Sequence, residues 1–289
     1  MNALIFGASG QTGHYLAQTC EAGGMTPVGV SRSGSGIHAD VGDFDAVRAL
    51  VREHRPDFVF HLAAASTTRH DALFENHATI STGTLNVLEA VRLDCPAARV
   101  FLTGSGVQFV NTGAPIAETD PFEASSPYSV ARIHSVYAGR YYRSLGQRVY
   151  VGYLFHHESP LRKPTHVSKK VALAARRIAS GSGEKLELGD VHVEKEWTFA
   201  GDVARAIFAL VRQDAVFEAV IGTGVTHTIA DWLERCFRLV GKDWRAHVTL
   251  REGFVPEYRR LVSNPATIRS LGWKPEIAFD ELARMMMGV

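Results

Sequence analysis

Short apolar runs alternate with longer amphipathic stretches through the first half of the chain. The apolar runs are expected to form strands, and they lie at residues 3–6, 27–30, 58–62, 100–102 and 149–154. The stretches expected to form helices lie at residues 11–22, 45–54 and 79–92, the last with Leu85, Leu88 and Val91 at helical spacing. Strands that alternate with helices predict a parallel sheet covered on both faces, and right-handed connections make it doubly wound.

The pattern changes after residue 154, where prolines and glycines interrupt it. Helices are expected over residues 167–179 and 229–240, the second with an amphipathic pattern. We therefore expect an α/β fold: a Rossmann-type doubly wound sheet over residues 1–154 and a smaller C-terminal lobe over residues 155–289. Ligands of open α/β sheets bind at the carboxyl ends of the strands, so the ligand cleft should lie between the lobes.

A glycine-rich segment follows the first strand directly and opens the first helix. Its sequence is Gly7-Ala8-Ser9-Gly10-Gln11-Thr12-Gly13. The first glycine permits a tight turn, the second lets the backbone approach a pyrophosphate, and the third lets helix and strand pack closely. Free N–H groups at the start of the helix attract phosphate. A plain glycine-rich turn is the alternative. The residues expected to contact a dinucleotide are Gly7, Ser9, Gly10, Gln11, Thr12 and Gly13.

The end of the second strand indicates which dinucleotide is bound. An acidic residue at this position accepts the ribose 2′-hydroxyl of NAD, whereas an arginine suits the 2′-phosphate of NADP. Arg32 occupies the position and favours NADP over NAD, with a solvated surface arginine as the alternative. Asp40, ahead of the second helix, is a candidate either for contact with the adenine or for the cap of that helix.

A tyrosine near the start of a later helix is the second candidate for chemistry. Ser126 is expected to cap that helix and Pro127 to be its first residue. Tyr128 and Arg132 are four residues apart and share a helix face. A cation beside a phenol favours its ionised form, so Tyr128 is suited to exchange a proton with a sugar hydroxyl while hydride moves to or from a nicotinamide. A surface aromatic that merely pairs with Arg132 is the alternative.

Several segments together resemble the extended short-chain dehydrogenase/reductases of the epimerase/dehydratase group and, within that group, the GDP-mannose 4,6-dehydratases. The resemblance covers nearly the whole chain. Besides the glycine-rich segment and the Tyr128 segment, it is carried by His61-Leu62-Ala63-Ala64-Ala65-Ser66, Leu154-Phe155-His156-His157-Glu158-Ser159-Pro160, Glu196-Trp197-Thr198-Phe199-Ala200-Gly201-Asp202-Val203 and Leu271-Gly272-Trp273-Lys274-Pro275.

This resemblance implies an NADP-binding Rossmann core, a C-terminal lobe that binds a nucleoside diphosphate sugar, and chemistry at sugar C4. It implies that residues 197–224 return to the first domain, and that two or four copies associate through the helix bearing Tyr128 as a homodimer or homotetramer. The cofactor contacts that it adds are Leu62, Ala63 and Ala64. The nucleotide-sugar contacts that it implies are His157, Glu158, Lys169, Leu188 and Lys195.

Two departures from the family pattern change the expected chemistry. The family has Tyr-x-x-x-Lys, and this chain has Arg132 in place of the lysine; arginine keeps the charge but is planar and bulkier. The dehydratases carry Thr-x-Glu after the preceding strand, and an ungapped alignment from Tyr128 puts Gly104 and Gly106 there. Nothing obvious replaces the glutamate. The candidates to replace the threonine hydroxyl are Thr103 and Ser105.

The missing glutamate favours oxidoreduction over dehydration. Removal of water across C5 and C6 requires an acid/base group, and such groups contribute roughly 10²–10⁴-fold to a rate. Hydride transfer at C4 needs only the tyrosine, a hydroxyl and the cofactor. We therefore expect an NADP-dependent enzyme that acts on a GDP-sugar and either reduces a 4-ketosugar or epimerises C4. The alternatives are a GDP-mannose 4,6-dehydratase-like dehydratase and a catalytically impaired NADP-binding regulatory or scaffold subunit.

Composition narrows the possible partners. The chain has 31 basic and 30 acidic residues, which gives no reason to expect nucleic acid or an anionic membrane as a partner. No apolar run approaches the ~20 residues of a membrane span, and the N-terminus enters a strand without the features of a signal peptide. Three widely spaced cysteines favour a reducing, cytoplasmic compartment over a disulfide framework. No histidine or cysteine spacing indicates a metal site.

Overall fold

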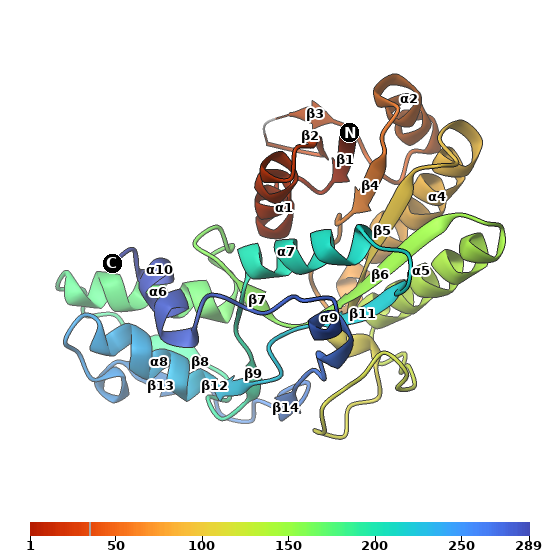
Figure 1. Cartoon of the computed structure of the whole chain (residues 1–289). Coiled ribbons are helices and arrows are strands. Elements are labelled where there is room, and N and C mark those ends of the chain that lie inside the picture. The colour runs from red at the N-terminus through yellow and green to blue at the C-terminus, as the bar shows by residue number, and fades with distance from the viewer. Residues whose placement is uncertain (35) are drawn as a thin grey trace.

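Seven parallel strands form the main sheet, in the order β11-β6-β5-β4-β1-β2-β3 (Figure 1). The structure is a computed structural model, and it describes residues 1–34 and 36–289. The chain builds outward from β1 in both directions, so the expected doubly wound Rossmann-type sheet is confirmed. The strands are β1 (Asn2–Phe6), β2 (Thr26–Ser31), β3 (Ile37–His38), β4 (Phe58–His61), β5 (Arg99–Ser105), β6 (Arg148–Leu154) and β11 (Glu218–Ile221).

Helices cover both faces of this sheet because the strands are apolar on both sides. In β1, Leu4 and Phe6 pack into one core and Ala3 and Ile5 into the other. The helices on the first face are α2 (Phe44–His54), α4 (Gly83–Asp94) and α5 (Pro127–Ser144). Those on the second face are α1 (Gln11–Ala22) and α7 (Ala200–Val211).

The start of α4 differs from the helix expected over residues 79–92. Residues His77–Thr82 form a π-helical turn after the short helix α3 (Leu73–Asn76), and the α-helix begins only at Gly83. Leu88 and Val91 are buried, but Leu85 is exposed. A spacing of three residues falls 60° short of a full turn at each step, so Leu85 lies off the buried face.

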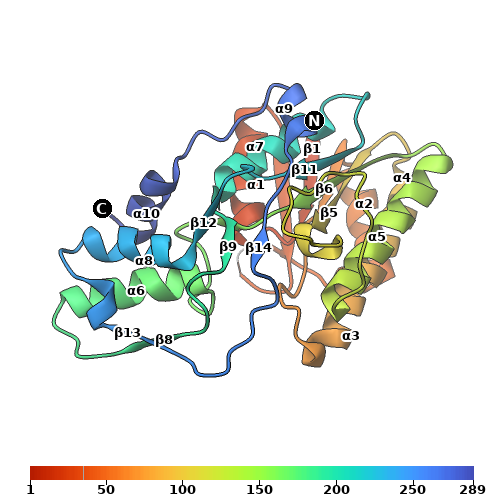
Figure 2. The same cartoon turned by 90° about the horizontal axis from the view of Figure 1, so that it is seen from below.

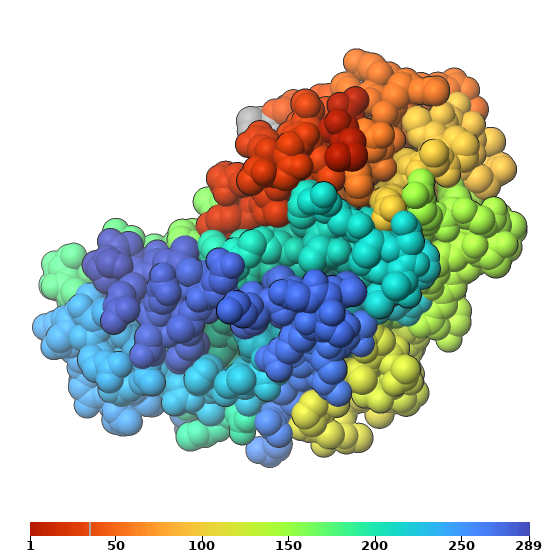
Figure 3. All heavy atoms as spheres, in the orientation of Figure 1, coloured from red at the N-terminus to blue at the C-terminus, as the bar shows by residue number. Residues whose placement is uncertain are grey.

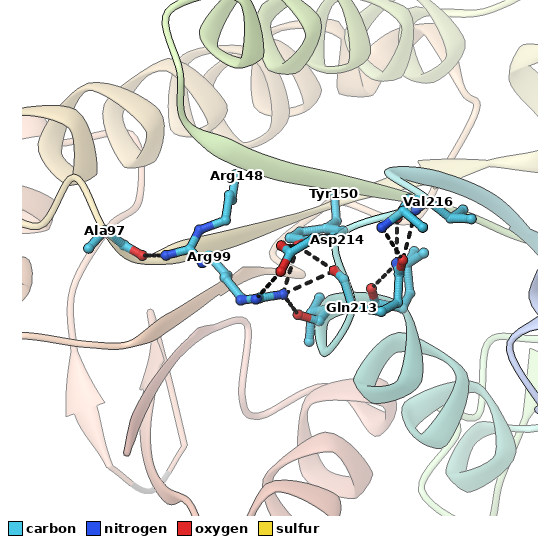
Figure 4. A network of polar contacts seen from close by, with 10 residues as sticks. Ala97, Arg99, Arg148, Tyr150, Gln213, Asp214 and Val216 are labelled. Atoms are coloured by element: carbon cyan, nitrogen blue, oxygen red, sulfur yellow. Dashed lines mark hydrogen bonds and ion pairs between the residues drawn. The ribbon is translucent and has the colours of Figure 1, made fainter.

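A segment of the second half joins the main sheet. Strand β11 pairs in parallel with β6, and α7 packs on α1. Figure 4 shows the polar network that binds this segment to the amino-terminal ends of β5 and β6. Arg99 of β5 donates to the carbonyl oxygens of Val211 and Gln213 at 2.8 and 3.0 Å and pairs with Asp214 at 2.8 Å. The part of the chain expected to return to the first domain, residues 197–224, contains both α7 and β11.

The remaining residues form a smaller lobe beside the sheet (Figures 1 and 2). Its core packs α6, α8 and α10 around two stacked indoles, Trp197 and Trp232, whose centroids are 4.6 Å apart. The lobe helices are α6 (Val167–Ala179), α8 (Ile229–Arg238) and α10 (Phe279–Met287), and α9 (Ala266–Ser270) lies beside β11. Its short strands are β7 (His157–Glu158), β8 (Leu186–Leu188), β9 (Glu194–Glu196), β10 (Thr198–Phe199), β12 (Thr226–Thr228), β13 (Val248–Leu250) and β14 (Arg260–Leu261).

The lobe and the sheet domain are in direct contact. In Figure 3 the teal α7–β11 segment lies between the red N-terminal residues and the blue C-terminal ones. The buried carboxylate of Asp202, on α7, accepts hydrogen bonds from the backbone N–H groups of Glu276 and Ile277, both at 3.1 Å. This contact ties the chain leading to α10 against the sheet domain. Among residues 1–34 and 36–289, no helix combines the length and apolar character of a membrane span.

Candidate active site

The main cavity, of about 650 Å³, lies at the carboxyl ends of the strands. It is lined by the last residues of β1, β2, β5 and β6, which are Phe6, Ser31, Ser105 and Leu154. Residues 154–166, which lead into the lobe, form much of the remaining wall. The cavity therefore lies where an open α/β sheet binds its ligand.

The glycine-rich turn forms a cradle that larger residues would fill. Gly7 has a φ of +90°, and a Cβ there would lie 2.7 Å from the backbone nitrogen of Ala63. A Cβ on Gly13 would overlap the carbonyl oxygen of Gly7. Helix α1 starts after Gly10 with no side-chain cap, which leaves its first N–H groups for a ligand. All six residues expected here to contact a dinucleotide line the cavity.

Two side chains of this turn are tied to the segment that follows β6. Gln11 donates to the carbonyl oxygen of His157 at 3.0 Å and accepts from the hydroxyl of Ser159 at 2.8 Å. The hydroxyl of Thr12 lies 2.9 Å from Nε2 of His157, whose Nδ1 lies 2.9 Å from the carbonyl oxygen of Phe155. Burial, together with Arg162, lowers the pKa of His157 to about 4, so the neutral ring donates to Phe155 and accepts from Thr12.

The end of β2 holds an ion pair. Arg32 lies in the cavity lining, half exposed, and its Nη2 is 2.8 Å from Oε1 of Glu75. Leu62, Ala63 and Ala64 also line the cavity.

Asp40 does not cap the second helix, so that alternative is wrong. The cap of α2 is Asp43, whose carboxylate accepts from the N–H of Ala46 at 3.1 Å. Asp40 instead closes a tight turn by accepting from the N–H of Gly42 at 2.8 Å. It is exposed and lies outside the lining, although its neighbours Ala39 and Val41 belong to it. Asp40 lies three positions before the cap residue, Asp43, which has the extended backbone of an N-cap.

Tyr128 lies in the first turn of α5 and faces the cavity. Ser126 caps the helix and Pro127 is its first residue, which confirms the expected helix start. The guanidinium carbon of Arg132 is 5.0 Å from the centroid of the Tyr128 ring. Arg132 is buried, and its Nη1 donates to the carbonyl oxygen of Thr103 at 2.6 Å. Its Nε has no partner within the described residues, so this cation has hydrogen-bonding capacity left.

The hydroxyls of Thr103 and Ser105 differ in their availability. Thr103 is buried and donates its proton to the carbonyl oxygen of His61 at 2.9 Å. Ser105 is half-buried at the end of β5 and accepts a long contact of 3.5 Å from the N–H of Val107. Ser105 keeps its own proton for a ligand, and Thr103 serves the sheet.

In the turn after β5, Val107 lines the cavity. A side chain at Gly106 would meet the ring of Phe155 at 2.8 Å, so that position faces the core. Gln108 is fully buried, and its Oε1 accepts from the N–H of Ser105 at 2.8 Å. Ser105 and Val107 both line the cavity. Ser105 and Val107 thus have the spacing of the family's Thr-x-Glu, one residue after the positions given by the ungapped alignment.

Within the described residues, Glu75 is the one carboxylate in the lining of the main cavity. Glu118 is engaged elsewhere: its oxygens accept from the N–H of Val220 at 2.6 Å and the hydroxyl of Thr267 at 3.2 Å. Glu123 is exposed outside the cavity. The basic residues of the lining are Arg32, Arg132, Arg162 and Lys163. This excess of positive charge suits a ligand that carries several phosphates.

A buried charge cluster lies behind the wall of the cavity. The fully buried carboxylate of Glu158 is 2.7 Å from Nε2 of His156 and 3.3 Å from Nε of Arg162. Burial opposes ionisation of Glu158, but its contacts with His156, Arg162 and Lys195 outweigh burial and hold the pKa of this carboxyl below its ordinary value. Lys195 lies 3.1 Å from the same His156 nitrogen. Burial lowers the pKa of Lys195 to about 8, with Glu158 opposing the shift and Arg162 adding to it.

A second cavity, of about 340 Å³, lies in the lobe and shares Thr165 and Tyr258 with the first. It is lined by Leu188 and Lys195, two of the predicted nucleotide-sugar contacts, and by the ring of Phe254, which covers Gly189. Lys169 lines neither cavity, because its ammonium donates to the carbonyl oxygen of Pro160 at 2.8 Å. The lining residues that the sequence did not indicate include Glu75, Arg162, His166 and Tyr258.

The sequence matches the GDP-mannose 4,6 dehydratase family over residues 4–286. The chain belongs to this family. It is 30% identical to GDP-mannose 4,6 dehydratase 1 of Arabidopsis thaliana over 99% of this chain and 88% of that protein. It is 29% identical to GDP-mannose 4,6-dehydratase of Vibrio cholerae, over 99% of this chain and 92% of that protein. The expected family is thereby confirmed.

Solved structures share the fold. UDP-glucose 4-epimerase of Thermus thermophilus, in complex with NAD, gives a TM-score of 0.85 at 23% identity, covering 100% of this chain and 98% of that one. RMD of Pseudomonas aeruginosa, complexed with NADPH, gives 0.86 at 23% identity, covering 99% and 97%. This family member is an NAD(P)-dependent enzyme with the extended short-chain dehydrogenase/reductase fold, as the sequence predicted.

Proposed function

We propose that this chain is an NADP-dependent oxidoreductase that acts at C4 of a GDP-linked sugar, by reducing a 4-ketosugar or by epimerisation. The carrying observation is that the turn after β5 lines the cavity with Ser105 and Val107 and contributes no carboxylate to it. The one carboxylate in the described lining, Glu75, is paired with Arg32 at the end of β2. An apolar side chain neither removes a proton from C5 nor protonates a leaving hydroxyl.

The residues present fit a dinucleotide. The Gly7 and Gly13 cradle, the uncapped start of α1 and the basic lining all suit a pyrophosphate. A nicotinamide bound here would supply or accept the hydride. Arg32 supports NADP over NAD, because a guanidinium pairs with a 2′-phosphate.

Tyr128, Arg132 and Ser105 supply the proton chemistry in this proposal. The Ser105 hydroxyl hydrogen-bonds the sugar O4 and orients it toward Tyr128. Tyr128 donates its phenolic proton to O4 in reduction and accepts it in oxidation. The Arg132 guanidinium carbon lies 5.0 Å from the centroid of the Tyr128 ring and keeps a permanent positive charge against it. Thr103 holds Arg132 through its carbonyl oxygen and is a positioning residue.

The substrate lies across both cavities in this proposal. The second cavity takes the nucleoside, and the diphosphate is attracted by Arg162 from the main cavity and by Lys195 from the second. Glu158, expected as a sugar contact, lines neither cavity; together with His156 it holds Lys195 and Arg162 in position. His157 acts through its bonds to Thr12 and Gln11, which join this segment to the cofactor turn.

A 4,6-dehydratase is the second candidate, because curated dehydratases align with this chain over almost its whole length. For that reaction another group in the cavity would have to replace the glutamate. The neutral His156 and His157 rings are poor replacements, since burial lowers their pKa values to about 3 and about 4.

The test is NADPH oxidation with a GDP-linked 4-ketosugar. Wild type should turn over, and Tyr128→Phe should lose at least ~10²-fold in kcat because its proton donor is gone. Calorimetry should show that Tyr128→Phe still binds NADP within about twofold of wild type. A wild type that binds NADP without turnover on any sugar would contradict the proposal and support the regulatory-subunit alternative.

A further inference from the structure

The cofactor end of the main cavity holds a carboxylate as well as an arginine. Glu75 belongs to α3, far along the chain from Arg32, yet its Oε1 lies 2.8 Å from Arg32 Nη2. Both side chains line the main cavity, with 50% and 52% of their surface exposed. The pair is therefore open to a ligand as well as to solvent.

The position of Glu75 is set by buried neighbours. Asn76, next along α3, is fully buried and donates to the carbonyl oxygen of Thr67 at 3.0 Å. Thr67 itself lines the cavity. This anchor holds the backbone of Glu75 against the cavity, so its carboxylate stays within reach of Arg32.

A carboxylate and a guanidinium have opposite preferences at this position. The residue that directly follows β2 faces the adenosine ribose 2′-oxygen in Rossmann-type sites. A carboxylate there accepts a hydrogen bond from the 2′-hydroxyl of NAD, whereas a guanidinium pairs with the 2′-phosphate of NADP. A phosphate that pairs with Arg32 competes with Glu75 for the same guanidinium and lies beside a carboxylate of like charge.

We propose that Glu75 is a specificity-determining residue that limits the preference of Arg32 for a 2′-phosphate and keeps the site open to NAD as well. This proposal rests on the proposed function, because it presupposes a dinucleotide in the main cavity. With a 2′-hydroxyl the Arg32–Glu75 pair stays intact and Glu75 accepts the hydroxyl. With a 2′-phosphate the pair opens.

The experiment compares two probes that differ only in the 2′-phosphate, 2′,5′-ADP and 5′-AMP. Calorimetric titration at fixed ionic strength gives the Kd of each for wild type, Glu75→Gln and Arg32→Gln, and NADP and NAD are titrated in the same way. Glu75→Gln should tighten the binding of 2′,5′-ADP about fivefold and leave the binding of 5′-AMP unchanged or weaker. Arg32→Gln should weaken the binding of 2′,5′-ADP. In the Arg32→Gln background, Glu75→Gln should increase the affinity for 2′,5′-ADP by a smaller factor than it does in wild type.

Asp71→Asn is the matched control. Asp71 is an exposed carboxylate four residues before Glu75, paired with Arg69 and outside the cavity lining. Its removal changes the net charge equally, so it should leave both Kd values within about twofold. An unchanged Kd for 2′,5′-ADP in Glu75→Gln, or an equal gain in Asp71→Asn, overturns the role of Glu75. A wild type that binds neither probe nor NADP or NAD contradicts the proposed cofactor site itself.

Discussion

Ser105 and Thr103 carry hydroxyls two residues apart on β5, and their hydrogen bonds give them different roles. Thr103 donates to the carbonyl oxygen of His61, while Ser105 keeps its proton. Ser105→Ala should lower kcat/KM about 10²-fold, because the sugar oxygen loses its donor. Thr103→Val should instead lower the free energy of unfolding by about 1 kcal/mol and change kcat/KM much less. Steady-state kinetics and urea unfolding distinguish the two, and the reverse pattern would exclude Ser105 as the sugar's partner.

Lys195 gives the site a dependence on pH. Burial lowers its pKa to about 8, so the ammonium is charged below that pH and neutral above it. Because only the charged form attracts a diphosphate, kcat/KM for the nucleotide sugar should fall as the pH rises through about 8. Lys195→Arg should remove this inflection, since a guanidinium stays charged.

The pH profile of kcat/KM for the nucleotide sugar checks this prediction. Circular dichroism first establishes that Lys195→Arg is folded. An inflection near pH 8 that persists unchanged in a folded Lys195→Arg enzyme would assign it to another group.

At the scale of elements, the contact between α1 and β1 depends on Gly13. A Cβ there would overlap Gly7 and lie 2.7 Å from Cα of Ala8. Gly13→Ala should therefore push α1 away from the turn after β1 and lower the free energy of unfolding by about 1–3 kcal/mol. It should also weaken the binding of NADP at least ~10-fold. Gly183→Ala is the control, because a Cβ at Gly183 meets nothing within 4 Å. Thermal melts and calorimetry with both variants check the prediction, and equal behaviour of the two would contradict it.

Local sequence patterns predicted the elements well because each depends on its own residues. Short apolar runs predicted the strands of the sheet, and the amphipathic stretches between them predicted helices on both of its faces. Helix α6 spans the expected residues 167–179, and Ser126 caps α5 as expected. Side-chain pairing between elements was less predictable. Glu75 meets Arg32 only after folding, and Lys169 turns to Pro160 rather than to a cavity. The place of Val107 depends on which way the turn after β5 faces, and residue spacing does not determine that direction.

The whole molecule presents an apolar stripe along α5. Val130, Tyr137, Tyr141 and Leu145 are 50–60% exposed and lie seven, four and four residues apart, on one helix face. We propose that the stripe joins two copies into a homodimer, whose own association would give the homotetramer. The combined change Tyr137→Glu and Tyr141→Glu should then give monomers in sedimentation velocity.

Val255→Glu is the control for the stripe. Val255 is 84% exposed on the loop between β13 and β14, away from α5. It should leave the oligomeric state unchanged. A wild type that sediments as a monomer at micromolar concentration would contradict the proposed dimer.

The mass of the sugar product tests the central claim most directly. The enzyme is incubated with NADPH and a GDP-linked 4-ketosugar, and separately with NADP and GDP-mannose. The mass of each nucleotide-sugar product is then measured by mass spectrometry. The account predicts that the ketosugar gains the mass of two hydrogen atoms or, for epimerisation, that GDP-mannose is converted at constant mass to its C4 epimer, which chromatography before the mass measurement separates from it. Loss of one water from GDP-mannose would contradict it, because Val107 offers no acid or base for that step.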